Sequence, residues 1–245
     1  MTQGKTQTPK RAEETRGAMG KALGPAARMQ GATLPGGWTV GDQIGPGGSR
    51  SVGYHVTGPN GETAFLKALD IFRAYEAEDT LAAIDDMSSS IRHERDLIGL
   101  CAQHRMSRVV RGLDQGVVKL QENEHGVWYL IFERAEGDVR HELAKTREDG
   151  HVWRLRTLHE AAVGLQQMHR RGLCHQNVKP AHLLAFGAQG IKIGDLSAAS
   201  TNGTPAPMFD SNTPGDRAYA PPECLYGFRL PDDLQSHRAR DMYLF

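Results

Sequence analysis

The segment that decides the fold reads H-Q-N-V-K-P-A-H-L-L over residues 175–184. It follows a stretch in which apolar residues recur at helical spacing, namely Val152, Leu155, Leu158, Ala162, Leu165 and Met168. Gly172 ends this stretch as a C-terminal cap would, so a long amphipathic helix leads directly into the segment. Residues 190–193 then form a short strand-like run that stops just before Asp195. The sequence therefore predicts a polar loop held between a helix and a short strand.

Four other segments stand in a fixed order around this loop. They read I-G-P-G-G-S-R-S-V at 44–52, A-F-L-K at 64–67, D-L-S at 195–197 and A-P-P-E at 220–223. Each resembles a protein kinase motif, in order the glycine loop, the strand lysine, the magnesium aspartate and the end of the activation segment. The loop at 175–184 resembles the catalytic loop H-R-D-L-K-P-x-N. Because five motifs follow one another between Trp38 and Phe245, the chain resembles the protein kinase superfamily.

The resemblance extends to a bacterial serine/threonine-kinase-like group with loops of the form H-Q-D-I-K-P-S-N-V-L and segment ends of the form G-D-R-T-Y-A-P-P-E-L. It implies an α+β, protein-kinase-like two-lobed fold. We expect a small antiparallel-sheet N-lobe at 38–133, a hinge at 133–137 and an incomplete helical C-lobe at 138–245. The C-lobe is expected to be partial because residues 241–245 resemble the start of its central helix, which would leave Leu155, Leu165 and Leu184 with too little cover.

Residues 1–37 lack hydrophobic periodicity and carry a mild excess of Lys and Arg. This composition predicts a disordered basic tail, and the simplest interpretation is that the tail is a solvated linker. Within the predicted sheet, residues 58–61 (G-P-N-G) form a turn between strand-like runs at 52–57 and 63–70.

The composition limits the choice of partner and compartment. Lys plus Arg and Asp plus Glu each number 29, so the formal net charge is zero. This removes the whole-chain electrostatic argument for binding nucleic acid or membrane. The three cysteines show neither a disulfide framework nor zinc-ligand spacing, and the longest apolar run, 127–132, is too short to span a bilayer. These features predict a cytoplasmic protein.

A lysine inside an apolar strand-like run is the first candidate site residue. Lys67 lies on the apolar face of its strand with Phe65 and Leu69, where a charged side chain is costly unless it has a partner. The resemblance implies that Lys67 binds the α- and β-phosphates of ATP and pairs with a helical glutamate. Glu94 is the first candidate, because it lies in a stripe of apolar residues at helical spacing, while Glu76 and Glu78 remain possible partners.

Further residues are expected, from the resemblance, to surround the nucleotide. They are Gly45, Gly47, Val52, Lys67, Glu133, Ala135 and Leu184. Two departures crowd this site. Phe65 stands where the family usually has Ala above the adenine, and Arg50 stands where the third glycine of the loop is expected. We therefore predict weak ATP binding or none.

The metal position also departs from the family pattern. The resemblance makes Asp195 a magnesium ligand, since a hard cation prefers carboxylate oxygen; the alternative is a turn Asp that caps the next segment. His182 replaces the Asn that would hold a second ion. An imidazole nitrogen suits Mg²⁺ poorly but is acceptable for Mn²⁺ or Zn²⁺. The simpler interpretation, in which His182 only fills its site, is preferred.

The catalytic Asp position holds Asn177, which cannot take up a proton, so general-base assistance should be missing. Lys179, which would contact the γ-phosphate, is retained. We therefore predict a degenerate serine/threonine kinase-like protein, or pseudokinase, that acts through contacts with a protein partner. The alternative is an active or weakly active kinase that uses ATP with Mg²⁺ or Mn²⁺ on a protein substrate. The third possible function, that of a small-molecule phosphotransferase, is the least favoured. Such enzymes normally lack the Pro-Glu pair that ends the activation segment, which in this chain is Pro222-Glu223.

Overall fold

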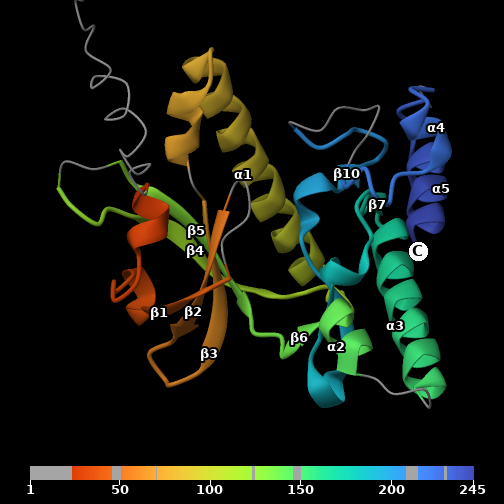
Figure 1. Cartoon of the computed structure of the whole chain (residues 1–245), viewed down its shortest axis with the longest axis horizontal. Helices are drawn as coiled ribbons and strands as arrows, with labels where there is room; N and C mark the ends of the chain where they lie inside the picture. Colours follow the sequence, from red (N-terminus) through yellow and green to blue (C-terminus); the bar gives the residue numbers. More distant parts are fainter. Residues whose placement is uncertain are drawn as a thin grey trace, which may run out of the picture.

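The computed structural model describes residues 24–45, 51–69, 71–122, 125–145, 150–207, 215–228 and 231–245. These residues form two lobes (Figure 1). One lobe contains a five-stranded sheet and helix α1, and the other contains helices α2, α3, α4 and α5. The predicted α+β, two-lobed architecture is confirmed.

The sheet of the first lobe is antiparallel, with strand order β1-β2-β3-β5-β4. Its strands are β1 (Thr39–Ile44), β2 (Ser51–Thr57), β3 (Thr63–Leu69), β4 (Gly112–Val118) and β5 (Val127–Glu133). The predicted turn at 58–61 joins β2 to β3, and Gly61 there has φ +81°, a conformation that favours glycine. In β3, Ala64, Leu66 and Ala68 are fully buried, as the alternation of a strand requires.

Helix α1 (Thr80–Gln103) follows the short 3₁₀ turn Ile71–Glu76 and connects β3 to β4. The helix begins where Asp79 caps it, with the carboxylate of Asp79 accepting a hydrogen bond from Ala82 N at 3.0 Å. Its buried side chains are Ile91, Glu94, Leu97 and Cys101. The predicted amphipathic helix is therefore present, and a carboxylate lies within its apolar stripe.

The segment before the sheet differs from the expected disordered tail. Residues 24–37 pack against the sheet through the 3₁₀ turns Pro25–Arg28 and Pro35–Gly37, and Ala26, Met29 and Leu34 join the core of the first lobe. Backbone hydrogen bonds reinforce this packing, because Gly31 N donates to Val40 O and Val40 N donates to Ala32 O. The expectation is wrong here because three isolated apolar residues are enough to anchor a segment without periodicity. Residues 1–23 lie outside the described part of the chain.

The second lobe contains short strands and helices that surround one apolar core. The helices are α2 (Val139–Lys145), α3 (His151–His169), α4 (Pro222–Leu225) and α5 (Leu234–Leu244). The strands are β6 (Gly137–Asp138), β7 (Leu173–Cys174), β8 (Leu183–Ala185), β9 (Ile191–Ile193) and β10 (Ser200–Thr201), and the 3₁₀ turns are Pro180–His182, Gly187–Gln189 and Leu196–Ala198. No helix in the described ranges has the length and apolar character to cross a membrane.

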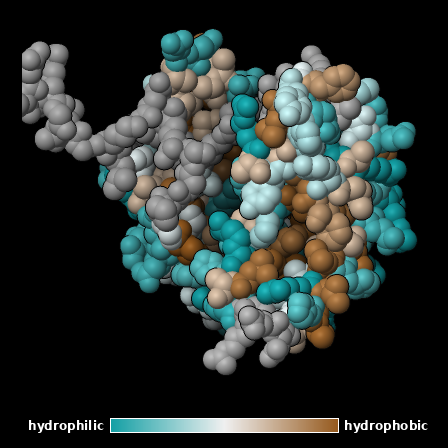
Figure 2. Space-filling view, turned by 45° about the vertical axis from the view of Figure 1, so that its right-hand side comes forward, coloured by the Kyte–Doolittle hydropathy of each residue, from teal (hydrophilic) through white to brown (hydrophobic). Residues whose placement is uncertain are grey.

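Helix α3 buries only the C-terminal part of the predicted apolar stripe, Leu165 and Met168, together with residues outside that stripe. Its buried residues include Thr157, Glu160 and Leu165, whereas Val152 and Leu155 are 79% and 68% exposed. The expected lack of cover is therefore confirmed for Leu155 and wrong for Leu165. Figure 2, in which the helical lobe is turned forward, shows hydrophobic surface gathered on this side of the molecule. The apolar pattern identified the helix correctly, but tertiary packing decided which turn of it is covered.

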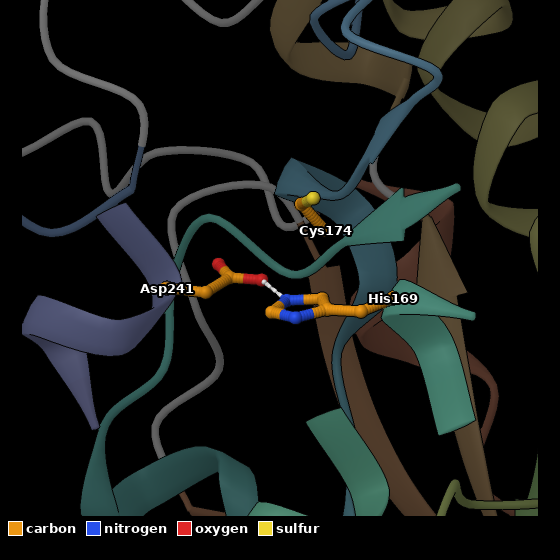
Figure 3. Close-up of side chains that lie close together, drawn as sticks. All are labelled: His169, Cys174 and Asp241. Atoms are coloured by element: carbon orange, nitrogen blue, oxygen red, sulfur yellow. Dashed lines mark hydrogen bonds and ion pairs between the residues drawn. The ribbon is translucent and has the colours of Figure 1, made fainter. Parts of the chain in front are cut away.

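Helix α5 is tied to the lobe by one buried carboxylate, that of Asp241 (Figure 3). One oxygen accepts hydrogen bonds from His175 N at 2.8 Å and from the His169 ring at 2.8 Å, and the other accepts from Gln176 N at 2.7 Å. The Gln176 side chain also donates to this carboxylate, at 3.1 Å. The helix begins at Leu234, seven residues before the predicted start at 241, where Asp233 caps it through Ser236 N. Asp241 thus joins α5 and α3 to the loop at 175–184.

We predict that Asp241→Asn lowers the free energy of unfolding by about 3 kcal/mol, because an amide replaces one acceptor oxygen by a donor that faces N–H groups. Urea denaturation followed by circular dichroism measures the change. Asp86→Asn, an exposed carboxylate on α1, serves as the control and should alter stability by less than about 0.5 kcal/mol. Equal stability of the Asp241 and Asp86 variants would show that the loop does not depend on this carboxylate.

Candidate active site

The structure brings Lys67 of β3 and Glu94 of α1 into direct contact. Lys67 Nζ lies 2.8 Å from both carboxylate oxygens of Glu94, and the two side chains are 17% and 5% exposed. Burial alone would lower the pKa of Lys67, but attraction by Glu94 and Asp195 outweighs it, so the pKa is raised and the lysine is charged. Among the glutamates considered as partners, Glu94 is in contact with Lys67, and Glu78 is exposed two residues before α1. The side chain of Glu76 lies outside the described residues.

Asp195 lies between β9 and the 3₁₀ turn Leu196–Ala198, and its carboxylate faces both Lys67 and His182. Its Oδ1 is 3.5 Å from Lys67 Nζ and accepts a hydrogen bond from Ser197 Oγ at 2.7 Å. The residue therefore caps the following turn and also faces the lysine. Burial raises the pKa of the Asp195 carboxyl, but Lys67 more than offsets this and holds the pKa well below its usual range. Its backbone is left-handed, with φ 58°, a strained conformation for a residue other than glycine.

Asn177 and Lys179 both contact the chain segment that begins at Gly215. Asp216 N donates to Asn177 Oδ1 at 3.0 Å, and Lys179 Nζ lies 2.9 Å from Asp216 Oδ2. The hydrogen bond to Lys179 lowers the pKa of Asp216, which is therefore an anion at neutral pH. A Cβ on Gly215, at φ +82°, would lie 2.7 Å from Gln176 O. The segment is thus pressed against the loop, and the amide oxygen of Asn177 is already occupied.

His182 has one ring nitrogen on the backbone and the other on Asp195. Its Nδ1 lies 2.9 Å from Asn177 O, and because a carbonyl oxygen only accepts, Nδ1 carries a proton. Its Nε2 lies 3.2 Å from Asp195 Oδ2. Burial lowers the pKa of His182 to about 4, so the neutral ring presents a lone pair to a carboxylate oxygen. Such a contact is unfavourable unless a cation lies between the two atoms.

This pair of atoms fits a single metal ion. Two ligand atoms that each lie about 2.0–2.2 Å from one ion, at a right angle or slightly more, are separated by about 3 Å. The 3.2 Å separation of His182 Nε2 and Asp195 Oδ2 matches this value. A ligating histidine also normally donates its other N–H to a carbonyl, as His182 does to Asn177 O. The residues therefore fit a divalent ion held by one nitrogen and one oxygen.

The residues expected around the nucleotide lie at the junction of the two lobes, except those of the glycine loop. Val52 is buried in β2, and Ala135 and Leu184 pack with Phe65 against a small apolar cluster that contains Phe132. Gly45 is exposed with φ +66°, while Gly47 and Arg50 lie outside the described residues. The Phe65 ring lies 6.3 Å from the Phe132 ring, and a Cβ on Gly53 would be 2.8 Å from it.

The Glu133 side chain is held by contacts with a lysine and a backbone amide. Both of its carboxylate oxygens lie 2.8 Å from Lys192 Nζ, and Oε1 also accepts from Arg111 N at 2.8 Å. Lys192 in turn lies 4.6 Å from the centre of the Phe186 ring. The side chain of Glu133 is therefore committed to the protein, so a nucleotide contact would have to use its backbone.

A second group of metal-ligand types, His169, Cys174 and Asp241, is better explained by hydrogen bonding. Their ligand atoms lie within 4.8 Å of one another. Both oxygens of Asp241, however, already accept hydrogen bonds from N–H groups, and burial raises the pKa of the Cys174 thiol to about 12. Figure 3 shows the Asp241 carboxylate directed at the His169 ring, with no interaction drawn to Cys174. A protonated thiol and a saturated carboxylate do not hold a metal.

Two residues of the site were not predicted from the sequence. Asp216 lies in the segment G-D-R at 215–217, which matches the start of the family form G-D-R-T-Y-A-P-P-E-L, but it was assigned no role. Asp241 was predicted only as the first residue of a helix. Each forms contacts with residues more than thirty positions away in the chain, Lys179 for Asp216 and His175 for Asp241. One signal was available for Asp241, because a lone carboxylate among apolar and aromatic residues near the end of a helix is costly to bury without donors.

Comparison with known proteins finds similarity to protein kinases. The chain is 25% identical over 180 residues, or 72% of its length, to "Serine/threonine-protein kinase grp" of Drosophila melanogaster. It is 27% identical over 60% of its length to "Mitogen-activated protein kinase 17" of Arabidopsis thaliana, and 30% identical over 49% to "Mitosis inhibitor protein kinase wee1" of Schizosaccharomyces pombe. The matches span 30%, 32% and 14% of these relatives' own lengths.

No protein-family model matches the chain. The relatives nevertheless agree with one another in kind, since each is a protein kinase. Their match to this chain, taken with the two-lobed fold, shows that the chain is related to the protein kinase superfamily.

Proposed function

We propose that this chain is a catalytically impaired protein kinase-like domain, a pseudokinase, that acts through contacts with a protein partner. One observation carries the proposal. The position of the catalytic base holds an amide, Asn177, whose Oδ1 accepts a hydrogen bond from Asp216 N. An amide has no proton-accepting capacity near neutral pH, and general-base assistance is worth roughly a hundred- to ten-thousandfold in rate. Lys179, expected to meet the γ-phosphate, is already paired with Asp216.

The proposal includes weak nucleotide binding. The buried network of Lys67, Glu94 and Asp195 supports retention of a phosphate-binding charge at the right place. The expected adenine position supports weak binding, because the Phe65 ring there lies against Gly53 and packs with Ala135 and Leu184. ATP affinity no better than high micromolar follows from these two opposing effects.

The proposed metal site contains His182 and Asp195. When bound, a divalent ion would neutralise phosphate charge beside Lys67. Because one of the two ligand atoms is an imidazole nitrogen, the site should favour Mn²⁺ or Zn²⁺ over Mg²⁺. The geometry therefore favours a role in metal binding for His182 over the simpler interpretation that it only fills its site.

The second candidate function is a weakly active ATP-dependent serine/threonine kinase. The intact contact between Lys67 and Glu94 favours it, since both groups are already in place and require no rearrangement to meet a nucleotide. Positioning and charge alone supply much of the rate enhancement in phosphoryl transfer. Phosphorylation of a generic protein substrate distinguishes the two functions.

Replacing Asn177 by Asp should raise phosphotransfer at least about tenfold, because the carboxylate restores a proton acceptor and keeps the oxygen that Asp216 N contacts. Transfer of labelled phosphate from ATP to a generic protein substrate measures the rate. Lys67→Ala, introduced into both proteins, controls for contaminating kinases. If wild type already transfers phosphate at an ordinary kinase rate, and Lys67→Ala abolishes it, the chain is an active kinase and the pseudokinase proposal fails.

Replacing Phe65 by Ala should tighten ATP binding at least about fivefold, because it removes the ring above the expected adenine position. Isothermal titration calorimetry with ATP and a divalent ion measures the dissociation constant. Tyr75→Ala, an exposed aromatic residue outside the site, is the matched control. A low-micromolar dissociation constant for wild type would contradict the crowding argument.

Replacing His182 by Asn should weaken Mn²⁺ binding at least about tenfold while changing Mg²⁺ binding little, because only the nitrogen ligand is lost. Electron paramagnetic resonance of Mn²⁺ counts the bound ion directly and needs no catalytic activity. His159→Asn, on α3 and away from the site, is the control. If the two variants bind Mn²⁺ equally, His182 is not a ligand.

A further inference from the structure

A basic hollow lies beside the hinge, and neither Lys67 nor Asp195 is among the residues that line it. Its volume is ≈ 760 Å³, far more than the roughly 30 Å³ that a single water molecule occupies. The C-terminal end of α1, residues 105–111 and β9 form its walls, and Glu133 is its one contact with the hinge. An adjoining hollow of ≈ 360 Å³ shares Arg105 and Met106 with it and extends to Arg170 and Arg171.

The walls of these two hollows are basic although the whole chain has no net charge. The cations that line them are Arg105, Arg108, Arg111, Lys192, Arg170 and Arg171, against the carboxylate of Glu133. The sequence explains the excess, because neither 97–113 nor 161–194 contains an Asp or a Glu. Folding brings these two acid-free stretches together, and the positive charge of both is concentrated at one place.

Four of the arginines, Arg105, Arg111, Arg170 and Arg171, are exposed and free to bind a ligand within the described part of the chain. Arg108 is committed, since its guanidinium donates to Gln189 O at 2.6 Å and contacts Glu160 at 3.3 Å. Lys192 is committed to Glu133. The guanidinium groups of Arg105 and Arg111, by contrast, make no hydrogen bond or ion pair with any other residue in the described ranges, and both side chains are exposed.

The backbone that carries these arginines is held in place. Arg111 N donates to Glu133 Oε1, and Glu133 N donates to Arg111 O at 3.0 Å. Arg108 O accepts from Ile193 N at 2.8 Å, and Arg108 N donates to the Gln167 side chain at 2.9 Å. A preformed site loses less entropy when it binds a ligand, so these contacts favour binding.

We propose that this hollow is an anion site for a small molecule that carries several phosphate groups. Guanidinium groups bind phosphate oxygens in pairs, which makes arginine the preferred residue for such ligands. Among the residues that the structure describes, no Phe, Tyr or Trp lines either hollow, so these residues offer no aromatic platform for stacking a base. This favours a compact polyphosphate over a nucleotide or a single-stranded nucleic acid. The site is separate from the one that contains Lys67 and does not depend on phosphotransfer.

Isothermal titration calorimetry of the whole chain with inorganic tripolyphosphate and with inositol hexakisphosphate tests the proposal. The double variant Arg105→Gln/Arg111→Gln should bind at least about tenfold more weakly, because two charge-assisted contacts are removed. Arg154→Gln, an exposed arginine on α3, should bind like wild type. Lys67→Ala should also bind like wild type, which separates this hollow from the candidate active site. Comparison of the two anions shows whether the site prefers a linear polyphosphate or a phosphorylated ring.

Equal affinity of the double variant and wild type would overturn the proposal, as would a loss of binding in Lys67→Ala alone. Tighter binding of a short single-stranded RNA than of either anion, through the same two arginines, would assign the surface to nucleic acid instead. Circular dichroism of each variant, and the single variants Arg105→Gln and Arg111→Gln, establish that any loss of affinity arises in a folded protein.

Discussion

The buried carboxylate of Asp241 constrains the part of the chain on which any chemistry depends. It is fully buried, and it accepts hydrogen bonds from the backbone of His175 and Gln176. Gln176 has φ +61°, so these two N–H groups cannot be satisfied by a regular helix or strand. In a low-dielectric interior, an anion that satisfies otherwise unpaired donors is worth more than in water. The conformation at His175 and Gln176 is therefore set by a residue more than sixty positions later.

A second buried charge organises the other lobe. Lys67 lies between the carboxylates of Glu94 and Asp195, which belong to α1 and to the turn after β9. One ammonium group thus joins the sheet, the helix and the second lobe. Asn177 presents an amide oxygen to which Asp216 N donates. The anion beside Lys179 is that of Asp216.

The sequence was sufficient for the parts of the fold that repeat a local pattern. Strand-like runs at 52–57 and 63–70 predicted β2 and β3, and helical spacing placed Glu94 in the buried stripe of α1, from which it reaches Lys67. The covered face of α3 and the packing of Met29 were missed, because both depend on which other elements lie nearby. The bond from Asp216 to Lys179 was missed for the same reason, since no local pattern encodes a contact across 37 positions.

The formal net charge is a second case in which the sequence alone does not show where side chains meet in space. A formal net charge of zero describes an average over the chain, whereas a ligand responds to the field within about one Debye length, roughly 8–10 Å. The chain separates its charges along the sequence, and folding then places two acid-free stretches next to each other beside the hinge. Zero net charge consequently excludes a general affinity for polyanions but not a local one. The free guanidinium groups of Arg105 and Arg111 lie where that local field is least compensated, because Glu133 is already paired with Lys192.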